Sequence, residues 1–227
     1  MKFLLIILLL FSPARQIEQI DVKIITEQNS IFMDFENDNF KQDVNTHGNI
    51  VNILIENSNY LDLNLNHRLF INSSKLNSLG KYIKQVFHEL YNENITLRTF
   101  LQHISFYLRD NIKYWGDSPF KTPEEVIISK KANCIGYSAF VKELLSIVDI
   151  RTRYVSGFYL KKTKKKSYDP VPHRWLELFI PGSASFYFDP QYQGFKANYI
   201  VVNPGQDFRT IKKFKINFLK REKKFIN

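Results

Sequence analysis

Residues 133–149 read NCIGYSAFVKELLSIVD, and this stretch decides the fold that we predict for the chain. Asn133 is a good helix N-cap, which puts Cys134 at the first helical position. Most of the side chains that follow are apolar, and the polar ones line one narrow stripe: Ser138, Lys142, Ser146 and Asp149. A helix with so wide an apolar surface is buried on most sides, so the stretch predicts the central helix of a domain.

Two further helices are predicted upstream of this stretch. Apolar residues recur at helical spacing over residues 97–108, and Thr96 is a plausible N-cap before them. Residues 122–125 read TPEE, which combines an N-cap, a proline at the first helical position and a glutamate that completes a capping box. We therefore predict an amphipathic helix from Leu97 and a short helix that ends near Ser129.

Downstream of the central helix the apolar residues recur with a period of two. This pattern predicts strands over residues 151–160, 173–180 and 185–189, the last two joined by a short turn. One face of the middle strand carries Arg174, Leu176, Leu178 and Ile180, and the other carries His173, Trp175, Glu177 and Phe179. Helices followed by an antiparallel meander predict an α+β domain.

Cys134 is the only cysteine of the chain, so it forms no intramolecular disulfide, and it is either a buried structural residue or a nucleophile. A nucleophilic cysteine acts as its thiolate, which the N-terminus of a helix favours. It also needs an imidazole as base and acid, and a third group that orients the imidazole. His173 opens one predicted strand and Asp189 closes the next, and antiparallel pairing brings these two ends together. The topology therefore predicts that His173 and Asp189 lie side by side, as candidates for the second and third groups that a nucleophilic Cys134 needs.

Several blocks in this order resemble the core of the transglutaminase-like superfamily, which is related to the papain-like cysteine peptidases. They are NCIGYSAF at 133–140, RYVSGF at 153–158, HRWLE at 173–177 and FDP at 188–190. The resemblance spans roughly residues 96 to 192. It implies a papain-like core in which the helix that carries the cysteine packs on an antiparallel sheet that carries the histidine and the aspartate.

The resemblance also implies chemical roles. Cys134 would be the nucleophile, His173 the general base and acid, and Asp189 the group that orients the imidazole. Members of the superfamily form a thioester and pass the acyl group to water or to an amine. The chain departs from its relatives at Ala132, where they often carry glycine.

The second donor of an oxyanion hole is left open between two residues. The backbone N–H of Cys134 is one expected donor. In relatives a side chain upstream, often aromatic, supplies the other, and Trp115 or Tyr114 could do so here. The alternative is that both rings simply pack on the core.

The N-terminus predicts export. Residues 1–14 read MKFLLIILLLFSPA, a layout that is typical of a signal peptide cleaved after Ala14. The apolar run is shorter than the ~20 residues that span a bilayer, and an uncleaved anchor or a buried strand is the alternative. We expect a secreted or periplasmic protein with an N-terminal β-rich extension (15–79), a catalytic core (80–205) and a basic C-terminal segment (206–227).

The net charge of +10 is concentrated in two places, and the 44% hydrophobic composition excludes wholesale disorder. Five lysines lie within Lys161–Lys166, and residues 209–224 hold eight basic residues and one acidic residue. We interpret the first as a solvated hairpin tip rather than a nucleic-acid site, and a role in attracting acidic substrates or gating the cleft is a hypothesis. The second is either a last strand of the sheet or a basic segment that touches anionic lipid, and we favour the strand.

No metal or cofactor is expected, because the histidines other than His173 lack metal-ligand spacing: His47, His67, His88 and His103. The sequence therefore predicts an exported cysteine enzyme that acts on amide or peptide bonds through a thioester at Cys134. Hydrolysis is favoured over transfer to an amine, and the expected substrate is a peptide or protein, cell-wall peptide included. The alternatives are a protein-glutamine transglutaminase and a non-catalytic binding module that retains the fold.

Overall fold

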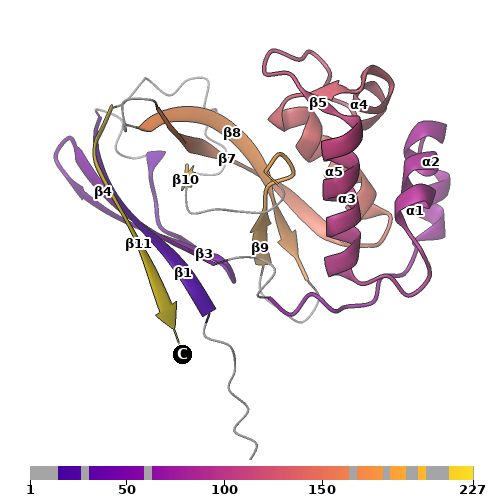
Figure 1. The fold of residues 1–227 in the computed structure, drawn as a ribbon, viewed down its shortest axis with the longest axis horizontal. Helices are drawn as coiled ribbons and strands as arrows, with labels where there is room; N and C mark the ends of the chain where they lie inside the picture. The colour runs from indigo at the N-terminus through magenta and orange to yellow at the C-terminus, as the bar shows by residue number, and fades with distance from the viewer. Residues whose placement is uncertain are drawn as a thin grey trace, which may run out of the picture.

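The computed structural model describes residues 15–26, 31–58, 63–163, 168–180, 185–192, 199–202 and 215–226, and the predicted signal peptide lies outside them. The described residues form eleven strands and five helices (Figure 1). The strands are β1 (Arg15–Ile25), β2 (Phe35–Glu36), β3 (Phe40–His47), β4 (Ile50–Ser58), β5 (Lys113–Tyr114), β6 (Lys131–Ala132), β7 (Arg151–Lys162), β8 (Tyr168–Phe179), β9 (Ser185–Phe188), β10 (Tyr199–Val201) and β11 (Lys215–Ile226). The helices are α1 (Ser73–Asn77), α2 (Lys81–Leu90), α3 (Leu97–Asn111), α4 (Pro123–Ser129) and α5 (Cys134–Ser146).

One sheet joins the two ends of the described chain. Its strand order is β11-β1-β4-β3-β2, and β11 runs antiparallel to β1 from Arg15 opposite Ile226 to Ile25 opposite Lys215. Figure 1 shows these two strands side by side. Residues 215–226 are thus a strand, and they complete the sheet of the N-terminal β-rich extension rather than standing apart from it.

The second sheet contains the predicted meander and has the order β10-β7-β8-β9. β8 begins at Tyr168, earlier than the predicted start at His173, so it includes Pro170 and Pro172. Within the described residues β8 pairs with β9 over residues 176–179, whereas both prolines pair only with β7. A proline lacks the N–H that a second neighbour would need, and it is therefore tolerated where the strand is an edge.

The helix starts agree with the local signals in the sequence. The Thr96 side chain accepts a hydrogen bond at the start of α3, and Thr122 and Glu125 form a complete capping box at α4. Asn133 caps α5, which begins at Cys134. In contrast, α1 lies within residues 15–79, the segment that the sequence predicts to be β-rich.

Two members of the predicted polar stripe contact the sheet, whereas Asp149 lies beyond the end of α5 and is exposed. Ser138 Oγ donates to the carbonyl oxygen of Arg174 at 3.3 Å, and Lys142 Nζ donates to the carbonyl oxygen of Thr152 at 2.8 Å. The other faces of α5 are largely buried among apolar side chains, as the composition of the helix predicts.

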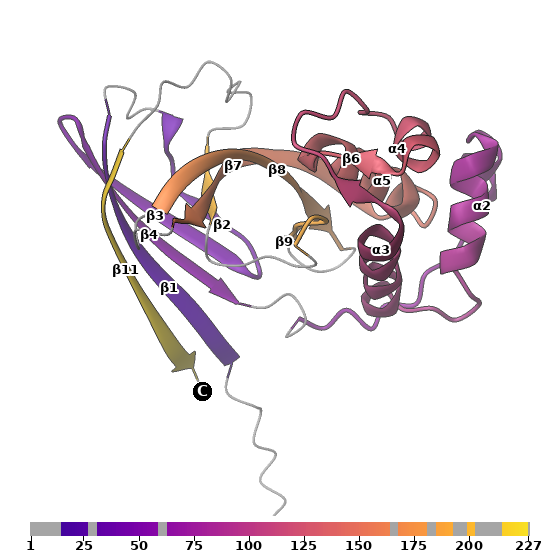
Figure 2. The ribbon, with the colours of Figure 1, turned by 45° about the horizontal axis from the view of Figure 1, so that its top comes forward.

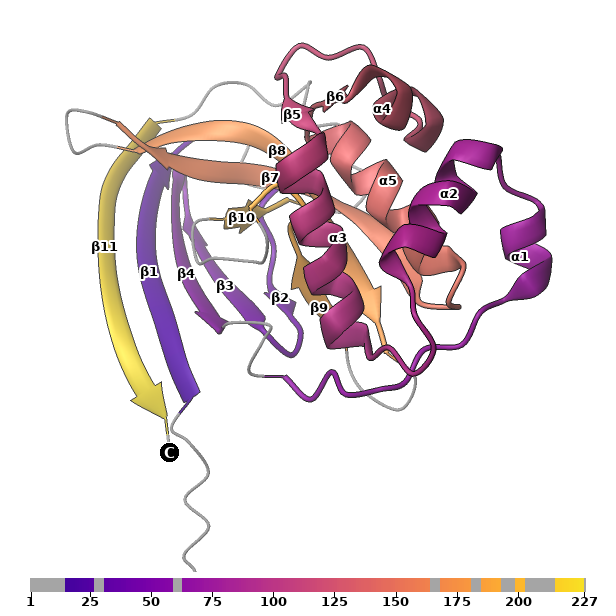
Figure 3. The ribbon, with the colours of Figure 1, turned by 45° about the vertical axis from the view of Figure 1, so that its right-hand side comes forward.

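Two hydrophobic cores lie on the two sides of β7 and β8. Leu176 and Leu178 belong to the core that these strands share with the helices, whereas Trp175 belongs to the core between the two sheets. Figure 2 shows the β7–β8 hairpin arching from the helices to the five-stranded sheet, and Figure 3 shows the helices and that sheet on opposite sides of it. No helix within the described ranges is long and apolar enough to cross a bilayer.

Candidate active site

Cys134 lies at the N-terminus of α5, and its side chain is partly buried. Asn133 Oδ1 accepts hydrogen bonds from the N–H groups of Ile135 at 3.0 Å and Gly136 at 3.2 Å. These bonds do not use the N–H of Cys134 itself. The unpaired N–H groups and the dipole of the helix favour a negative charge at this end.

Tight packing seats the first turn of α5. A Cβ at Gly136 would lie 2.9 Å from the carbonyl oxygen of Phe120 and 2.9 Å from Val126 Cγ2, both too close for any other residue. It would also lie 3.0 Å from the Cβ of Ala132, which is fully buried. The methyl group of Ala132, where relatives often have glycine, is thus accommodated because Gly136 has no side chain.

The structure places His173 beside Asp189, as the topology predicts, and brings both to Cys134 in one cluster. His173 Nε2 and Asp189 Oδ2 are 2.7 Å apart, and the two side chains are 5% and 0% exposed. A second hydrogen bond links the His173 imidazole to the Cys134 side chain. Because Nε2 is used by Asp189, Nδ1 is the nitrogen that remains for the cysteine.

The surroundings favour the protonated form of His173. Burial lowers the pKa of the imidazole, but the charge and hydrogen bond of Asp189 outweigh it, and the contacts with Cys134 add to them. Together they raise the pKa of His173 from 6.5 to about 9. At neutral pH the His173 side chain is therefore an imidazolium beside the Cys134 sulfur. A positive charge of this kind is the partner that a thiolate needs.

Asp189 receives hydrogen bonds from two further groups. The hydroxyl of Tyr199 on β10 donates to Oδ2, and the N–H of Gln191 donates to Oδ1 at 2.9 Å. Burial and the charge of Asp189 raise the pKa of Tyr199 well above its usual value near 10, so the phenol keeps its proton as a donor. The sequence analysis missed Tyr199, since no motif marks it. The only available signal is the apolar run YIVV at 199–202.

Aromatic rings surround the His173 imidazole. The ring centroids of Trp175, Tyr192, Tyr199 and Tyr159 lie 6.0, 5.8, 5.8 and 6.3 Å from its own. These rings restrict the orientation of the imidazole and shield its bond with Asp189 from water. A shielded charge pair is stronger than an exposed one because water no longer competes for its hydrogen bond.

The two candidates for the second oxyanion donor have different surroundings. The parallel pairing of β5 with β6 sets Tyr114 opposite Ala132. Burial and the negative charges of Cys134, Asp117 and Asp189 raise the pKa of Tyr114, while a hydrogen bond with the Gln191 side chain lowers it. Tyr114 therefore lies near the cluster.

Trp115 packs elsewhere on the same loop. Its ring centroid is 6.1 Å from that of Phe120, and Lys131 Nζ lies 5.5 Å from its ring. Both Tyr114 and Trp115 are more than 40% exposed, so neither is a core side chain, contrary to the packing alternative.

The lysine-rich stretch lies at the end of the β7–β8 hairpin. Lys161 and Lys162 are exposed and pair with Asp169 and Tyr168, whereas Lys164–Lys166 lie outside the described residues. Among the residues that are described, no group of three or more His, Cys, Asp and Glu side chains is placed to hold a metal ion.

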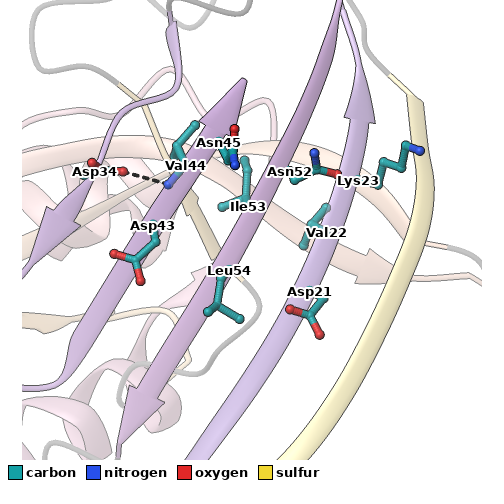
Figure 4. A pocket seen from close by; sticks show the side chains of 10 residues that line it. All are labelled: Asp21, Val22, Lys23, Asp34, Asp43, Val44, Asn45, Asn52, Ile53 and Leu54. Atoms are coloured by element: carbon teal, nitrogen blue, oxygen red, sulfur yellow. Dashed lines mark hydrogen bonds between the residues drawn. The ribbon is translucent and has the colours of Figure 1, made fainter. Parts of the chain in front are cut away.

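A separate hollow of about 430 Å³ lies on the five-stranded sheet (Figure 4). Its lining comes from β1, β3, β4 and the residue before β2: Asp21, Val22, Lys23, Asp34, Asp43, Val44, Asn45, Asn52, Ile53 and Leu54. None of the residues around Cys134 takes part in it, so it is distinct from the candidate active site.

The sequence profile of the transglutaminase-like superfamily matches residues 86–190. This segment contains α5, the meander and all three members of the Cys134 cluster. Residues 86–190 therefore match a transglutaminase-like domain, and the structure has the mixed helix and antiparallel-sheet fold that the resemblance implied.

Solved structures with a similar fold are distant in sequence. A candidate cysteine protease from Cytophaga hutchinsonii is 12% identical with a TM-score of 0.48, over 95% of this chain and 92% of that one. The periplasmic domain of TgpA from Pseudomonas aeruginosa is 12% identical with a TM-score of 0.40, over 77% of this chain and 70% of that one. No curated protein matches the sequence.

Proposed function

We propose that this protein is an exported cysteine hydrolase that cleaves an amide or peptide bond through a thioester at Cys134. The observation that carries the proposal is the cluster itself. A cysteine at a helix N-terminus is hydrogen-bonded to an imidazole, which a buried carboxylate keeps protonated at neutral pH. A buried structural cysteine would need neither partner.

In the first step the sulfur of Cys134 attacks the carbonyl carbon of the substrate, and the carbonyl oxygen becomes an oxyanion. The N–H of Cys134 and the hydroxyl of Tyr114 are our candidates to stabilise that oxygen. The oxyanion then collapses, the C–N bond breaks, and His173 gives its proton to the leaving nitrogen. The products are a free amine and a thioester on Cys134.

In the second step His173, now neutral, takes a proton from water, and the resulting hydroxide attacks the thioester carbonyl. The C–S bond breaks to release a carboxylic acid, and the thiolate and the imidazolium are restored. A primary amine in place of water would give a new amide instead. We favour hydrolysis because water needs no binding site of its own.

For the substrate we propose a peptide or protein, with cell-wall peptide among the candidates, and for the location a secreted or periplasmic one. The location rests on the sequence of residues 1–14. N-terminal sequencing of the protein recovered from the periplasm or medium should begin at Arg15. Recovery of full-length protein in the cytosol would reject export without affecting the chemistry.

The chemistry is tested with residues 15–227 and a casein digest, in the presence and absence of a fluorescent primary amine. Wild type should release new amino groups and give an acyl adduct on Cys134 by intact-mass spectrometry. Cys134→Ala should lose both signals while it keeps its fold. Ser146→Ala, at the far end of the same helix, is the matched control and should retain them.

Each other outcome selects an alternative. Fluorescent amine incorporated into casein in place of new amino groups would make the protein a transglutaminase. An unreactive Cys134 together with casein peptides bound equally by wild type and Cys134→Ala would favour the non-catalytic binding module.

A further inference from the structure

The two edges of the four-stranded sheet are each held by an amide side chain from the N-terminal part of the chain. At the β10 edge, Gln42 of β3 accepts a hydrogen bond from the N–H of Val201 at 2.9 Å. The same side chain donates to the carbonyl oxygens of Val201 at 3.0 Å and Met33 at 2.8 Å. Gln42 is fully buried, so water does not compete for these bonds.

At the β9 edge, Asn39 makes the equivalent contacts. It accepts a hydrogen bond from the N–H of Tyr187 at 2.8 Å and donates to the carbonyl oxygen of Tyr187 at 3.0 Å. Asn39 is 2% exposed. Each amide thus imitates the backbone of a neighbouring strand, because it pairs with both polar backbone groups of one residue.

These two strands carry the groups that meet at Asp189. Tyr187 lies two residues before Asp189, and Val201 lies two residues after Tyr199. The Tyr199 hydroxyl and His173 Nε2 both bond to the same oxygen, Oδ2 of Asp189. The position of β10 therefore decides whether Oδ2 has its second donor.

β10 lies close against β7. A Cβ at Gly157, which lies opposite His173, would overlap the carbonyl oxygen of Ile200 and lie 2.7 Å from the Trp175 ring, so only glycine permits this approach. Pairing with β7 holds β10 from one side and Gln42 holds it from the other. The tyrosine on this strand is consequently fixed by contacts on both sides.

We propose that Tyr199 is a positioning residue of the active site and that Gln42 of the five-stranded sheet holds it there. The Tyr199 hydroxyl keeps Oδ2 turned toward His173, and Gln42 keeps β10 in place. The five-stranded sheet thus supports the reacting groups as well as covering the core. The inference rests on the proposed function, but its test needs no substrate, because it measures the reactivity of Cys134 and the pKa of His173.

Tyr199→Phe removes one hydroxyl and leaves the ring that packs in the core. We measure the alkylation rate of Cys134 by iodoacetamide against pH, and the pKa of His173 by NMR. Asp189 raises the pKa of His173. Without the Tyr199 hydroxyl, the Asp189 carboxylate is no longer held against His173 Nε2, so it should raise this pKa less. We expect the pKa of His173 to fall from about 9 toward 6.5, and alkylation of Cys134 to slow relative to wild type between these two pH values, where only the variant has lost the imidazolium.

The charged and titratable groups that face His173 are Asp189, Cys134 and the tyrosines of its aromatic shell, and Tyr199→Phe changes only one of them. Tyr91→Phe is the matched control. It also loses one tyrosine hydroxyl, whose bond is to the carbonyl oxygen of Leu69 in the other core. It should leave both the His173 titration and the alkylation rate unchanged.

Gln42→Met preserves side-chain length without the polar atoms and should reproduce the effects of Tyr199→Phe. In the double variant the two effects on the His173 pKa should not add, because both substitutions act through the hydrogen bond between Tyr199 and Asp189. Ile53→Ala controls for lost stability, since it weakens the same core but makes no hydrogen bond to β10. If Gln42→Met does not fold, Tyr199→Phe still decides the first half of the proposal, and Asn39→Leu tests support from the sheet at the other edge.

The outcomes separate this proposal from the proposed function. An unchanged or raised pKa of His173 in Tyr199→Phe, or additive effects in the double variant, would overturn the positioning role. Failure of wild type to turn over casein would bear on the proposed function alone. If Ile53→Ala and Gln42→Met changed the His173 pKa and the alkylation rate equally, Gln42 would only stabilise the fold and would have no specific role in holding β10.

Discussion

Raising the pH should destabilise the fold through His173. The imidazole binds its proton more tightly in the folded chain, where its pKa is about 9, than in the unfolded chain, where it is near 6.5. A group of this kind contributes its full stabilisation below pH 6.5. The contribution is lost as the pH rises through 9, because the folded protein must then give up a proton that the unfolded chain has already released.

The size of the effect follows from the two pKa values. A difference of about 2.5 units at 1.36 kcal/mol per unit gives about 3 kcal/mol. His173 is only 4% exposed, so screening by water reduces this figure little. Losses of this size are a substantial part of the 5–15 kcal/mol that stabilises an ordinary domain.

The assay is urea unfolding at closely spaced values from pH 5.5 to 10. It compares His173→Gln with the parent, because glutamine keeps a donor for Asp189 but does not titrate. Both chains carry Cys134→Ala, which removes the ionisation of the thiol. This substitution also removes the smaller contribution of Cys134 to the His173 pKa, so we expect the difference in unfolding free energy to shrink by about 2 to 3 kcal/mol.

The reasoning would be refuted by a difference that stays constant between pH 6.5 and 9. A difference that grows with pH would reverse the sign and would mean that burial, which lowers the pKa of His173, outweighs the charge of Asp189. A direct NMR titration of the His173 ring in the same background checks the pKa independently of unfolding.

Three further predictions concern the thiol, the sheet and the oxyanion. His173→Ala should slow the alkylation of Cys134 by iodoacetamide at neutral pH, because the positive charge beside the sulfur is lost, and a rate equal to that of wild type would contradict the pairing of the two side chains. Gly157→Ala should lower the unfolding free energy by about 1 to 3 kcal/mol in urea titrations, because the added methyl group collides with the β10 backbone; a neutral result would show that β10 can move aside. Tyr114→Phe should lower kcat on casein peptides about a hundredfold with little change in KM, and a larger effect of Trp115→Phe would exchange their roles.

The local features of the fold were predictable from short stretches of sequence. The caps at Thr96, Thr122 and Asn133 act on N–H groups two or three residues away, so the residues that decide each helix start are neighbours in the chain. The alternating faces of β8 were predictable for the same reason, since successive side chains of a strand point to opposite sides. The meeting of His173 and Asp189 needed only one short antiparallel turn.

The supports of the site were not predictable in this way. Tyr199 reaches Asp189 from a short strand that no motif marks, and the surroundings of Tyr114 and Trp115 depend on the pairing of β5 with β6. The predicted start of β8 was too late. Pro170 and Pro172 argue against a strand in the interior of a sheet, and only the structure shows that this part of β8 is not paired with β9.

The starts of α3, α4 and α5, the two faces of β8 and the order of Cys134, His173 and Asp189 thus followed from the sequence alone. Which distant groups keep these three side chains in position depends on the tertiary structure. Gln42 and Val201 are 159 residues apart, and β1 pairs with a strand at the opposite end of the chain. A buried side-chain amide can form hydrogen bonds with any backbone N–H and carbonyl group that the fold brings near it. Its position in the sequence therefore does not predict its partner.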